Sequence, residues 1–195
     1  MLIAVEGIDG SGKTTVGKAI AQRLQFGFLE KVLQSTSGLS LSEYIKLREG
    51  LKQNTIAKDQ IMSMFFGMNN LICGTLGKTQ NVVADRYIAT NYYWYGCAET
   101  EPLFDTLIRL SGKPQLTVLL DISHETMQKR IEDRNYNSQS EKDRELALIP
   151  HVDLFSTKVT EFLNRYSFNY MIIKNDNRHI SDIVDEVISN IDFQN

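Results

Sequence analysis

The sequence predicts an α/β fold in which five strands are covered by helices on both faces. Five short runs are rich in β-branched and large apolar residues, and nearly every residue in them is apolar. Such runs are typical of strands buried on both faces, whereas strands with one face in water alternate apolar and polar residues. Stretches with helical periodicity separate the runs, and this alternation indicates an α/β protein. The expected strands cover residues 2–6, 28–33, 81–85, 115–121 and 169–174.

Three helices carry their own start signals. Ser40 followed by Glu43 forms a capping-box pattern, in which each residue satisfies a backbone N–H group of the other. Ser123 can cap a helix that runs to about Arg134. The last helix is expected to start near Ile180, because its apolar residues follow the spacing of three and four that places them on one face. These residues are Ile180, Ile183, Val184, Val187, Ile188 and Ile191.

Length and composition predict one compact domain, residues 1–195. Apolar residues make up 42% of the chain, and the net charge is -3. Charges of both signs are interspersed without a basic block, so we expect no nucleic-acid polymer as a partner. The chain has no basic leader and no run of about eighteen apolar residues, so we expect a cytoplasmic protein with no membrane partner. Cys73 and Cys97 lie far apart without a metal-binding spacing, which predicts neither a zinc site nor a disulfide framework.

A glycine-rich segment follows the first expected strand. It reads Gly7-Ile8-Asp9-Gly10-Ser11-Gly12-Lys13-Thr14, matches the pattern G-x-x-x-x-G-K-[ST] and leads into a helical run. Glycines allow backbone N–H groups to turn toward phosphate oxygens, and the dipole of the following helix favours negative charge there. Lys13 can bind the β- and γ-phosphates of ATP, and Thr14 can offer its hydroxyl to Mg²⁺. We therefore expect these eight residues and Thr15 to bind ATP.

A carboxylate and a guanidinium end the third expected strand. Asp85 and Arg86 fall at the carboxyl edge of the sheet, where the ligands of open α/β folds bind. Arg86 can grip a phosphate through two N–H groups, and Asp85 can hold the metal ion through water or orient Arg86. The alternative is an ion pair that merely closes the strand. The phosphate-binding segment upstream favours the functional interpretation.

These segments resemble the thymidylate kinase family, and the resemblance extends over nearly the whole chain. It implies the P-loop NTPase fold, with a five-stranded parallel sheet flanked by helices on both faces and a short lid at about 134–148. It also implies ATP as the donor, Mg²⁺ as the metal ion and a homodimer as the assembly. The resemblance rests on residues 3–15, on Asp85-Arg86-Tyr87 followed by Thr90-Asn91, on 114–121 with Arg130 and Arg134, and on Asp143-Arg144-Glu145.

The resemblance assigns contacts to the sugar and phosphate of the acceptor. Asp9 would approach the sugar, and Arg86 would bind the phosphate. Trp94 falls where the family keeps an aromatic residue near the sugar that helps to exclude a ribose hydroxyl.

The resemblance also assigns contacts to the acceptor base. Phe66 would stack on the base, although a phenylalanine in the apolar helix 62–73 can equally be a core residue. Thr90 and Asn91 would line the edge of the base, and Asn70 falls at the position of a family arginine that binds the pyrimidine carbonyl.

The acceptor side departs from the family pattern at two places. After its second strand the family carries an Arg-Glu-Pro segment, whose arginine and acid reach the acceptor phosphate, whereas residues 34–38 here read Gln-Ser-Thr-Ser-Gly. The second departure is Asn70 in place of arginine. Each lost charge-assisted contact to a buried phosphate typically costs about 1.5 to 3 kcal/mol. A neutral deoxynucleoside, or a monophosphate with another base, is therefore an alternative acceptor.

A polar stretch, residues 135–142, is expected to form a mobile surface loop within the lid. Arg130, Arg134, Lys142 and Arg144 flank or occupy it. A closing loop could bring Arg134 or Arg144 to the transferring phosphoryl group, as arginine fingers do. The alternative is an ordinary solvated, charged loop.

The sequence as a whole predicts ATP-dependent phosphoryl transfer to a nucleoside monophosphate, with the conversion of dTMP to dTDP as the first candidate. Catalysis would consist of positioning and charge stabilisation. The alternatives are a deoxynucleoside kinase, a monophosphate kinase for another base and, from a different class, a non-catalytic nucleotide-binding regulator. The expected catalytic residues are Lys13, Asp85, Arg86, Arg134 and Arg144, with Thr14 and Asp85 serving the metal ion.

Overall fold

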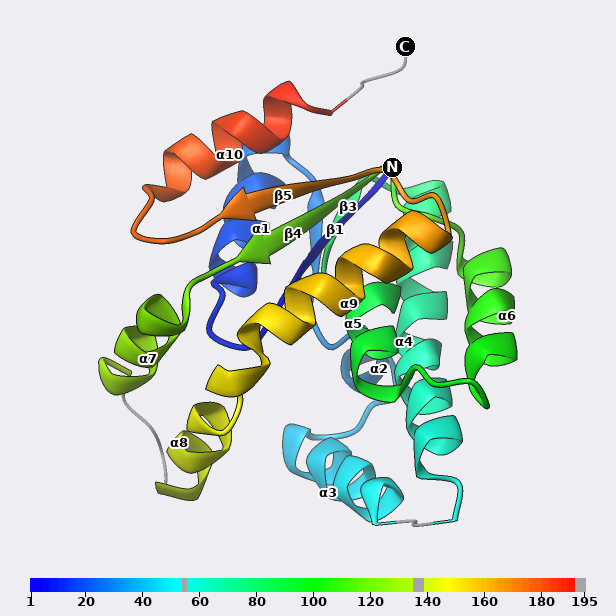
Figure 1. Ribbon diagram of the computed structural model, residues 1–195. Helices are drawn as coiled ribbons and strands as arrows, with labels where there is room; N and C mark the ends of the chain where they lie inside the picture. The colour runs from blue at the N-terminus through cyan, green and yellow to red at the C-terminus, as the bar shows by residue number, and fades with distance from the viewer. Residues whose placement is uncertain (54–55, 135–138, 192–195) are drawn as a thin grey trace.

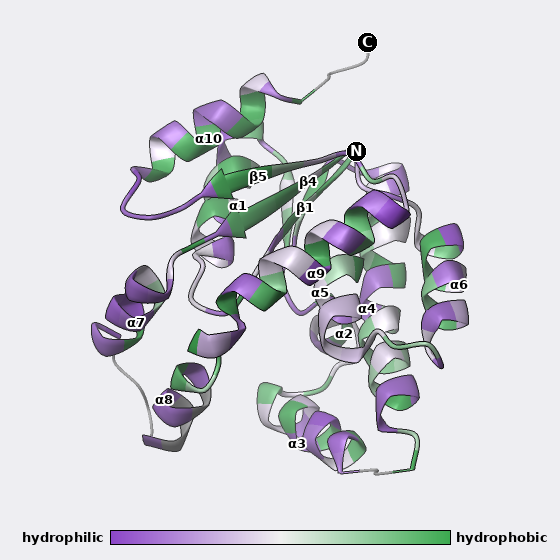
Figure 2. Cartoon of the chain, in the orientation of Figure 1, coloured by the Kyte–Doolittle hydropathy of each residue, from purple (hydrophilic) through white to green (hydrophobic). Residues whose placement is uncertain are grey.

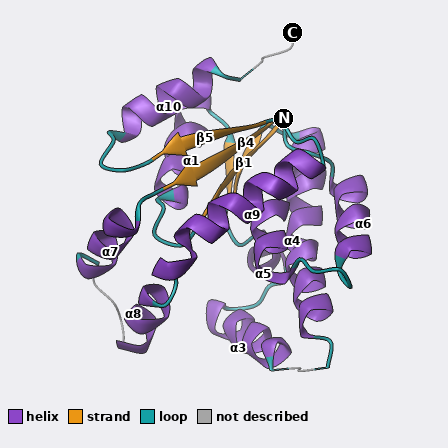
Figure 3. Cartoon of the chain, in the orientation of Figure 1, coloured by secondary structure: helices purple, strands orange, loops and turns teal. Residues whose placement is uncertain are grey.

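A parallel five-stranded sheet lies at the centre of the computed structural model, which describes residues 1–53, 56–134 and 139–191 (Figures 1 and 3). The strand order is β2-β3-β1-β4-β5, and every neighbouring pair is parallel. All carboxyl ends therefore meet at one edge, and the predicted α/β class is confirmed. The strands are β1 (Leu2–Gly7), β2 (Gly27–Leu29), β3 (Val82–Asp85), β4 (Leu116–Asp121) and β5 (Tyr170–Lys174).

Helices cover both faces of this sheet. On one face lie α1 and α10, and on the other lie α4, α5 and α9, with α6 packed outside α4 (Figure 1). Among the described residues, none of the helices combines the length and apolar character needed to cross a bilayer. The helices are α1 (Lys13–Leu24), α2 (Val32–Thr36), α3 (Leu41–Lys52), α4 (Lys58–Thr79), α5 (Ile88–Tyr95), α6 (Glu101–Ser111), α7 (His124–Glu132), α8 (Gln139–Leu146), the 3₁₀ turn η1 (Ile149–His151), α9 (Val152–Arg165) and α10 (Ile180–Ser189).

Successive residues of β1 belong alternately to two separate hydrophobic cores. Ile3 and Val5 belong to the core under α1 and α10, whereas Leu2 and Ala4 belong to the core under α4, α5 and α9. This follows from the alternation of side chains along a strand, and it explains why both sets of positions are apolar. Figure 2 shows the strands β1, β4 and β5 in the colour of hydrophobic residues and α7 mostly in that of hydrophilic ones.

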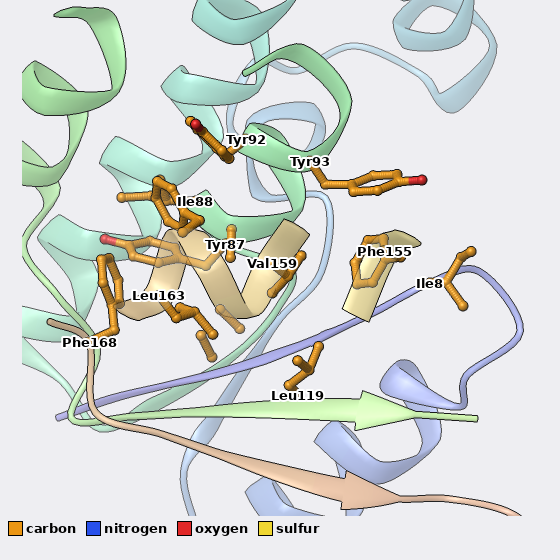
Figure 4. Packing of buried hydrophobic residues seen from close by; sticks show 14 of the residues in the cluster. Ile8, Tyr87, Ile88, Tyr92, Tyr93, Leu119, Phe155, Val159, Leu163 and Phe168 are labelled. Carbon is orange, nitrogen blue, oxygen red and sulfur yellow. The ribbon is translucent and has the colours of Figure 1, made fainter. Parts of the chain in front are cut away.

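The larger core is built mainly from long helical side chains. Figure 4 shows Ile88 of α5 with Val159 and Leu163 of α9, gathered above Leu119 of β4. All four are almost completely buried, and burial of each such side chain contributes roughly 1.5 to 3 kcal/mol. This packing sets the position of α5, whose first turn lies beside the phosphate-binding segment.

The helix start signals are confirmed where they were expected. The Ser40 hydroxyl accepts from the backbone N–H of Glu43, and the Glu43 carboxylate accepts from the N–H of Ser40. Ser123 caps α7 through the N–H of Thr126, although α7 ends at Glu132, two residues earlier than predicted. Helix α10 begins at Ile180 as predicted.

The second strand is shorter than the expected range 28–33. Strand β2 pairs with β3 over Gly27–Leu29 only, and Lys31 then adopts a left-handed conformation with φ of 49°. A strand cannot continue through that conformation, so the chain turns and enters α2. Val32 is apolar because it is buried in the larger core from a helix, and the strand prediction for 30–33 was wrong.

The loop expected over 135–142 is also partly wrong. Residues 139–142 begin helix α8, and 135–138 lie outside the described residues. The Gln139 side chain donates to the Asp143 carboxylate one turn later, at 2.8 Å. A polar composition prevents deep burial, but it is compatible with an exposed helix stabilised by pairs of this spacing.

We expect Gly74→Ala to destabilise the fold by about 1 to 3 kcal/mol, because the added methyl group has no room. A Cβ at Gly74 of α4 would lie 2.3 Å from the Ser111 carbonyl oxygen and 2.6 Å from the Tyr87 hydroxyl oxygen. Gly50 of α3 is a matched control, because a Cβ there meets nothing within 4 Å. Gly50→Ala should stabilise the helix by about 0.5 to 1 kcal/mol. Urea unfolding measures both changes, and equal midpoints for the two variants would contradict this packing.

Candidate active site

The phosphate-binding segment connects β1 to α1 at the carboxyl edge of the sheet. Gly10 and Gly12 have φ of 83° and 91°, a conformation that favours glycine. The Asn175 amide donates to the Ser11 carbonyl at 2.7 Å, and Arg130 donates to the Gly10 carbonyl at 3.1 Å. Because the peptide group is planar and trans, the N–H of Gly12 points away from Asn175. This bracing leaves the first N–H groups of α1 for a ligand, since no helical carbonyl precedes them.

Lys13 is buried although it carries an amino group. Its Nζ donates to the Ile8 carbonyl at 2.7 Å and lies 3.9 Å from Oδ1 of Asp9. Burial, and after it the charge of Arg86, lowers the pKa of Lys13 to about 7, against the opposing charge of Asp9. An entering anion would stabilise the charged form, so this side chain is prepared for a phosphate.

Thr14 and Asp85 lie together next to Lys13. The Thr14 hydroxyl donates to Oδ2 of Asp85, and Oδ1 of Asp85 is buried without a hydrogen-bond partner in the described part of the chain. A hydroxyl beside an unpartnered carboxylate oxygen fits a magnesium ion, which prefers oxygen ligands and keeps several waters. Within residues 1–53, 56–134 and 139–191 no cluster of three acidic, His or Cys side chains could bind a metal ion alone. Phosphate oxygens would thus have to complete the coordination.

Arg86 reaches the phosphate-binding segment from the turn between β3 and α5. Its guanidinium contacts the Asp9 carboxylate and donates to the Gly7 carbonyl at 3.3 Å. The Arg86 charge lowers the pKa of Asp9, with further lowering by Lys13, Arg134 and Arg48 against the effect of burial. Arg86 has φ of 73°, a conformation that costs about 1 to 3 kcal/mol in a non-glycine residue and is common at functional sites.

A cavity of about 400 Å³ joins these groups. Its wall contains cations from three neighbouring strand ends and acidic groups between them. A cavity rich in both cations and carboxylates suits phosphates together with a metal ion. The residues that line it are Asp9, Gly10, Gly12, Lys13, Thr14, Thr15, Glu30, Lys31, Asp85, Arg86, Arg134 and Glu145.

Of the two arginines expected to act from the lid, only Arg134 has a described side chain. Arg134 lines the cavity and forms two hydrogen bonds with the Glu145 carboxylate, at 2.8 and 2.7 Å. Arg144 lies in α8, but its side chain is outside the described ones. Arg130, expected at the lid entrance, instead braces the phosphate-binding segment, where it also donates to the Asn175 carbonyl at 2.6 Å.

Two expected base contacts, Asn70 and Asn91, are buried amides on α4 and α5. The Asn91 Nδ2 donates to the Ser63 carbonyl at 2.9 Å, while its Oδ1 has no partner in the described part of the chain. The Nδ2 of Asn70 likewise has no partner among the described residues. One unused acceptor and one unused donor therefore remain buried on these two helices, which pack against each other.

The other expected acceptor residues lie outside the phosphate cavity. The ring of Phe66 stacks on Tyr95, with centroids 5.7 Å apart, and belongs to a small aromatic cluster. The Thr90 hydroxyl donates to Glu6 rather than pointing into the cavity. Trp94 is partly exposed and packs edge-on against Tyr93.

Sequence reasoning missed Glu30 and Lys31. Because the second strand was drawn too long, these residues were counted as strand, whereas they lie at its carboxyl end and line the cavity. The segment 34–38, which was compared with the family's Arg-Glu-Pro, begins within α2, and the Gln34 amide donates to the Leu39 carbonyl. Lys31 thus supplies a cation on the side where one was thought to be lost.

Three further residues were missed because only the fold brings them to the site. Asn175 follows β5, Arg48 lies on α3 and lowers the pKa of Asp9, and Glu6 is a completely buried acid of β1. A polar residue inside an apolar strand was a usable signal for Glu6. No local pattern identifies the other two.

The comparisons with known proteins agree with this geometry. The family model described as thymidylate kinase matches residues 5–187. A probable thymidylate kinase of Archaeoglobus fulgidus is 31% identical over 150 residues, which cover 73% of this chain and 74% of the relative. Another, from Sulfolobus acidocaldarius, is 31% identical and covers 96% of this chain and 94% of the relative.

Solved structures share the fold. A deoxyadenosine kinase from M. mycoides matches with a TM-score of 0.61 and 15% identity, covering 97% of each chain. A thymidylate kinase from Ehrlichia chaffeensis matches with a TM-score of 0.58 and 20% identity, covering 97% of this chain and 96% of that one. Since the family model spans most of the sequence and the site has the groups that phosphoryl transfer needs, the chain belongs to the thymidylate kinase family and is a nucleotide kinase.

Proposed function

We propose that the chain transfers the γ-phosphoryl group of ATP to dTMP. One observation carries the choice of a monophosphate over a nucleoside: a row of three cations along the sheet edge. Lys13 follows β1, Arg86 follows β3 and Lys31 follows β2, and these strands are adjacent in the order β1, β3, β2. All three line one cavity. The donor needs Lys13, which leaves two cations beyond it for a second phosphate.

On the donor side, the amides at the start of α1 and the Lys13 ammonium bind the β- and γ-phosphates. Thr14 and Asp85 hold Mg²⁺, which supplies charge neutralisation on the phosphate oxygens when bound. The pKa of Lys13, which its protein surroundings lower to about 7, rises when phosphates replace the carbonyl of Ile8 as its partner. Lys13 then carries a full positive charge where negative charge develops.

On the acceptor side, Arg86 exchanges its ion pair with Asp9 for the acceptor phosphate. Asp9 is released toward the sugar, and Lys31 approaches the phosphate from the β2 side. The unused amide groups of Asn70 and Asn91 bind the base edge, with Phe66 and Trp94 beside the base and sugar. Arg134, which lines the cavity, closes over the transferring group, and the role predicted for Arg144 concerns a side chain outside the described ones.

The experiment is a panel of acceptors with ATP and Mg²⁺. We expect kcat/KM for dTMP to exceed that for thymidine by at least about 100-fold, because two charge-assisted contacts are unused when the phosphate is missing. A higher value for thymidine would make the chain a deoxynucleoside kinase. If none of the acceptors in the panel is phosphorylated, the non-catalytic regulator is the alternative that remains.

Asn70 favours a test of other bases in the same panel. An amide can donate or accept, whereas the arginine of the family pattern only donates. The panel therefore includes dCMP and dAMP, whose amino groups could donate to Oδ1 of Asn91, the buried amide oxygen without a partner among the described residues. Equal kcat/KM values for dTMP and dCMP would show that the base is read loosely.

A homodimer remains a prediction from the family resemblance, and a cytoplasmic location remains a prediction from the sequence. Light scattering on the purified chain measures the first, with a mass of twice the 22.2 kDa chain as the expected result.

A further inference from the structure

Glu6 is an acidic side chain with no solvent exposure, at the carboxyl end of β1. Side chains alternate along a strand, so Glu6 faces the same side as Leu2 and Ala4, the side covered by α4, α5 and α9. A charge in such a place is very costly unless hydrogen bonds compensate it. The partners of Glu6 therefore indicate why an acid occupies a core position.

The hydrogen bonds of the Glu6 carboxylate all go to the start of α5 within the described part of the chain. Its Oε1 accepts from the backbone N–H groups of Tyr87 at 3.0 Å and Ala89 at 3.1 Å, and its Oε2 accepts from the Thr90 hydroxyl. Helix α5 has no acidic residue in its first turn and no capping side chain of its own. Glu6 thus caps α5 from another element, and the helix dipole favours its negative charge.

This cap lies directly beside the strained residue of the site. Arg86 precedes Tyr87, has φ of 73°, and donates its own N–H to the Val5 carbonyl at 3.0 Å. Two successive residues of β1, Val5 and Glu6, therefore fix the backbone on both sides of the Arg86 Cα. Strain of this kind persists only where the surroundings over-determine the conformation.

We propose that Glu6 is a positioning residue that directs the Arg86 guanidinium toward the acceptor phosphate. Glu6 touches no substrate: its oxygens are fully occupied by α5, and its exposure is 0%. Losing the cap lets the turn relax toward an ordinary φ, which withdraws Arg86 from Asp9 and Gly7. The inference rests on the proposed function, because it assigns Arg86 to the acceptor.

Glu6→Ala and Glu6→Gln test the role in a pair. Glutamine can accept both N–H groups through its amide oxygen and donate to the Thr90 oxygen, so it preserves the geometry without the charge. We expect Glu6→Ala to raise the KM for dTMP about 10-fold or more, because the loss of one strong hydrogen bond from Arg86 to the phosphate has an effect of this size. The KM for ATP should change less than about 3-fold. Glu6→Gln should stay within about 3-fold of the wild type for both substrates.

The outcomes separate a positioning role from others. A parallel rise of both KM values would mean that Glu6 merely supports the fold, and equal losses of kcat in the Ala and Gln variants would mean that its charge acts directly. Either result overturns the proposal.

The variant Thr90→Val is the alternative test if Glu6→Ala does not fold, because it removes only one of the three hydrogen bonds. It should raise the KM for dTMP about 3-fold or more, whereas Thr90→Ser, which keeps the hydroxyl, should not. Equal KM values for Thr90→Val and Thr90→Ser would also overturn the proposal.

A measurement without substrate tests the structural link alone. Amide hydrogen exchange at Tyr87 and Ala89 should be faster in Glu6→Ala than in the wild type, and near the wild-type rate in Glu6→Gln. Unchanged exchange in Glu6→Ala overturns the proposal whatever the acceptor is. If exchange changes as expected but the wild type does not phosphorylate dTMP, the proposed function fails, and Glu6 is then a cap of α5 without the assigned role.

Discussion

Lys13→Ala is expected to lower kcat for phosphoryl transfer by about 100-fold to 1,000-fold, the loss seen when one preorganised donor is removed from a transition state. Lys13 is 6% exposed and lines the cavity, so its ammonium is held in place, whereas water that fills the space left by the variant carries no positive charge. Single-turnover rates with saturating ATP and dTMP measure the effect. Lys113→Ala is the matched control, because Lys113 lies at the opposite edge of the sheet and donates to the Ser167 carbonyl. Turnover in Lys13→Ala equal to that of Lys113→Ala would place the donor elsewhere.

The pKa of Lys13 adds a second readout to the same variant. Burial lowers the pKa of Lys13 to about 7, so without bound phosphates most of the amino group is neutral at pH 8. Phosphates favour the charged form, and binding of ATP with Mg²⁺ at pH 8 should therefore take up a proton. Calorimetry in buffers of different ionisation enthalpy measures this uptake, which Lys13→Ala should abolish. At pH 6 the amino group is already charged, so little uptake is expected.

Asp85→Asn is expected to raise the Mg²⁺ concentration for half-maximal activity by about 10- to 100-fold. Asparagine can still accept from the Thr14 hydroxyl, but it removes the negative charge of a carboxylate whose Oδ1 has no hydrogen-bond partner among the described residues. The control is Asp121→Asn. Asp121 ends β4 as Asp85 ends β3, yet its carboxylate pairs with Lys174 and does not line the cavity. An equal shift of the Mg²⁺ dependence in both variants would show a general effect of charge at this edge.

Local patterns in the sequence predicted the parts of the molecule that local chemistry determines. The strand β1, the phosphate-binding segment and α1 follow one another within a few residues. The spacing of the glycines and Lys13 was therefore enough to predict the loop between them. The caps at Ser40 and Ser123 are likewise contacts between near neighbours. Periodicity failed at Val32, because burial in a helix and burial in a strand select the same apolar residue.

The parts that sequence reasoning missed depend on strand order. Lys31 and Lys13 share a cavity because β3 lies between β2 and β1, and no run of residues encodes that order. Glu6 bonds to residues more than eighty positions away along the chain. Their position at the end of the third expected strand placed Asp85 and Arg86 at the edge where both line the cavity, but it could not show that Lys31, which follows a shorter strand, lines the same cavity.

The bracing of the phosphate-binding segment has a consequence for synthesis on the ribosome. Asn175 bonds to Ser11 across 164 positions, and Arg130 joins Gly10 to Asn175. The nascent chain carries residues 7–14 from the start of synthesis, but Asn175 can bond to Ser11 only after β5 has been synthesised. The phosphate-binding segment therefore reaches its fully braced conformation only after most of the polypeptide has been synthesised.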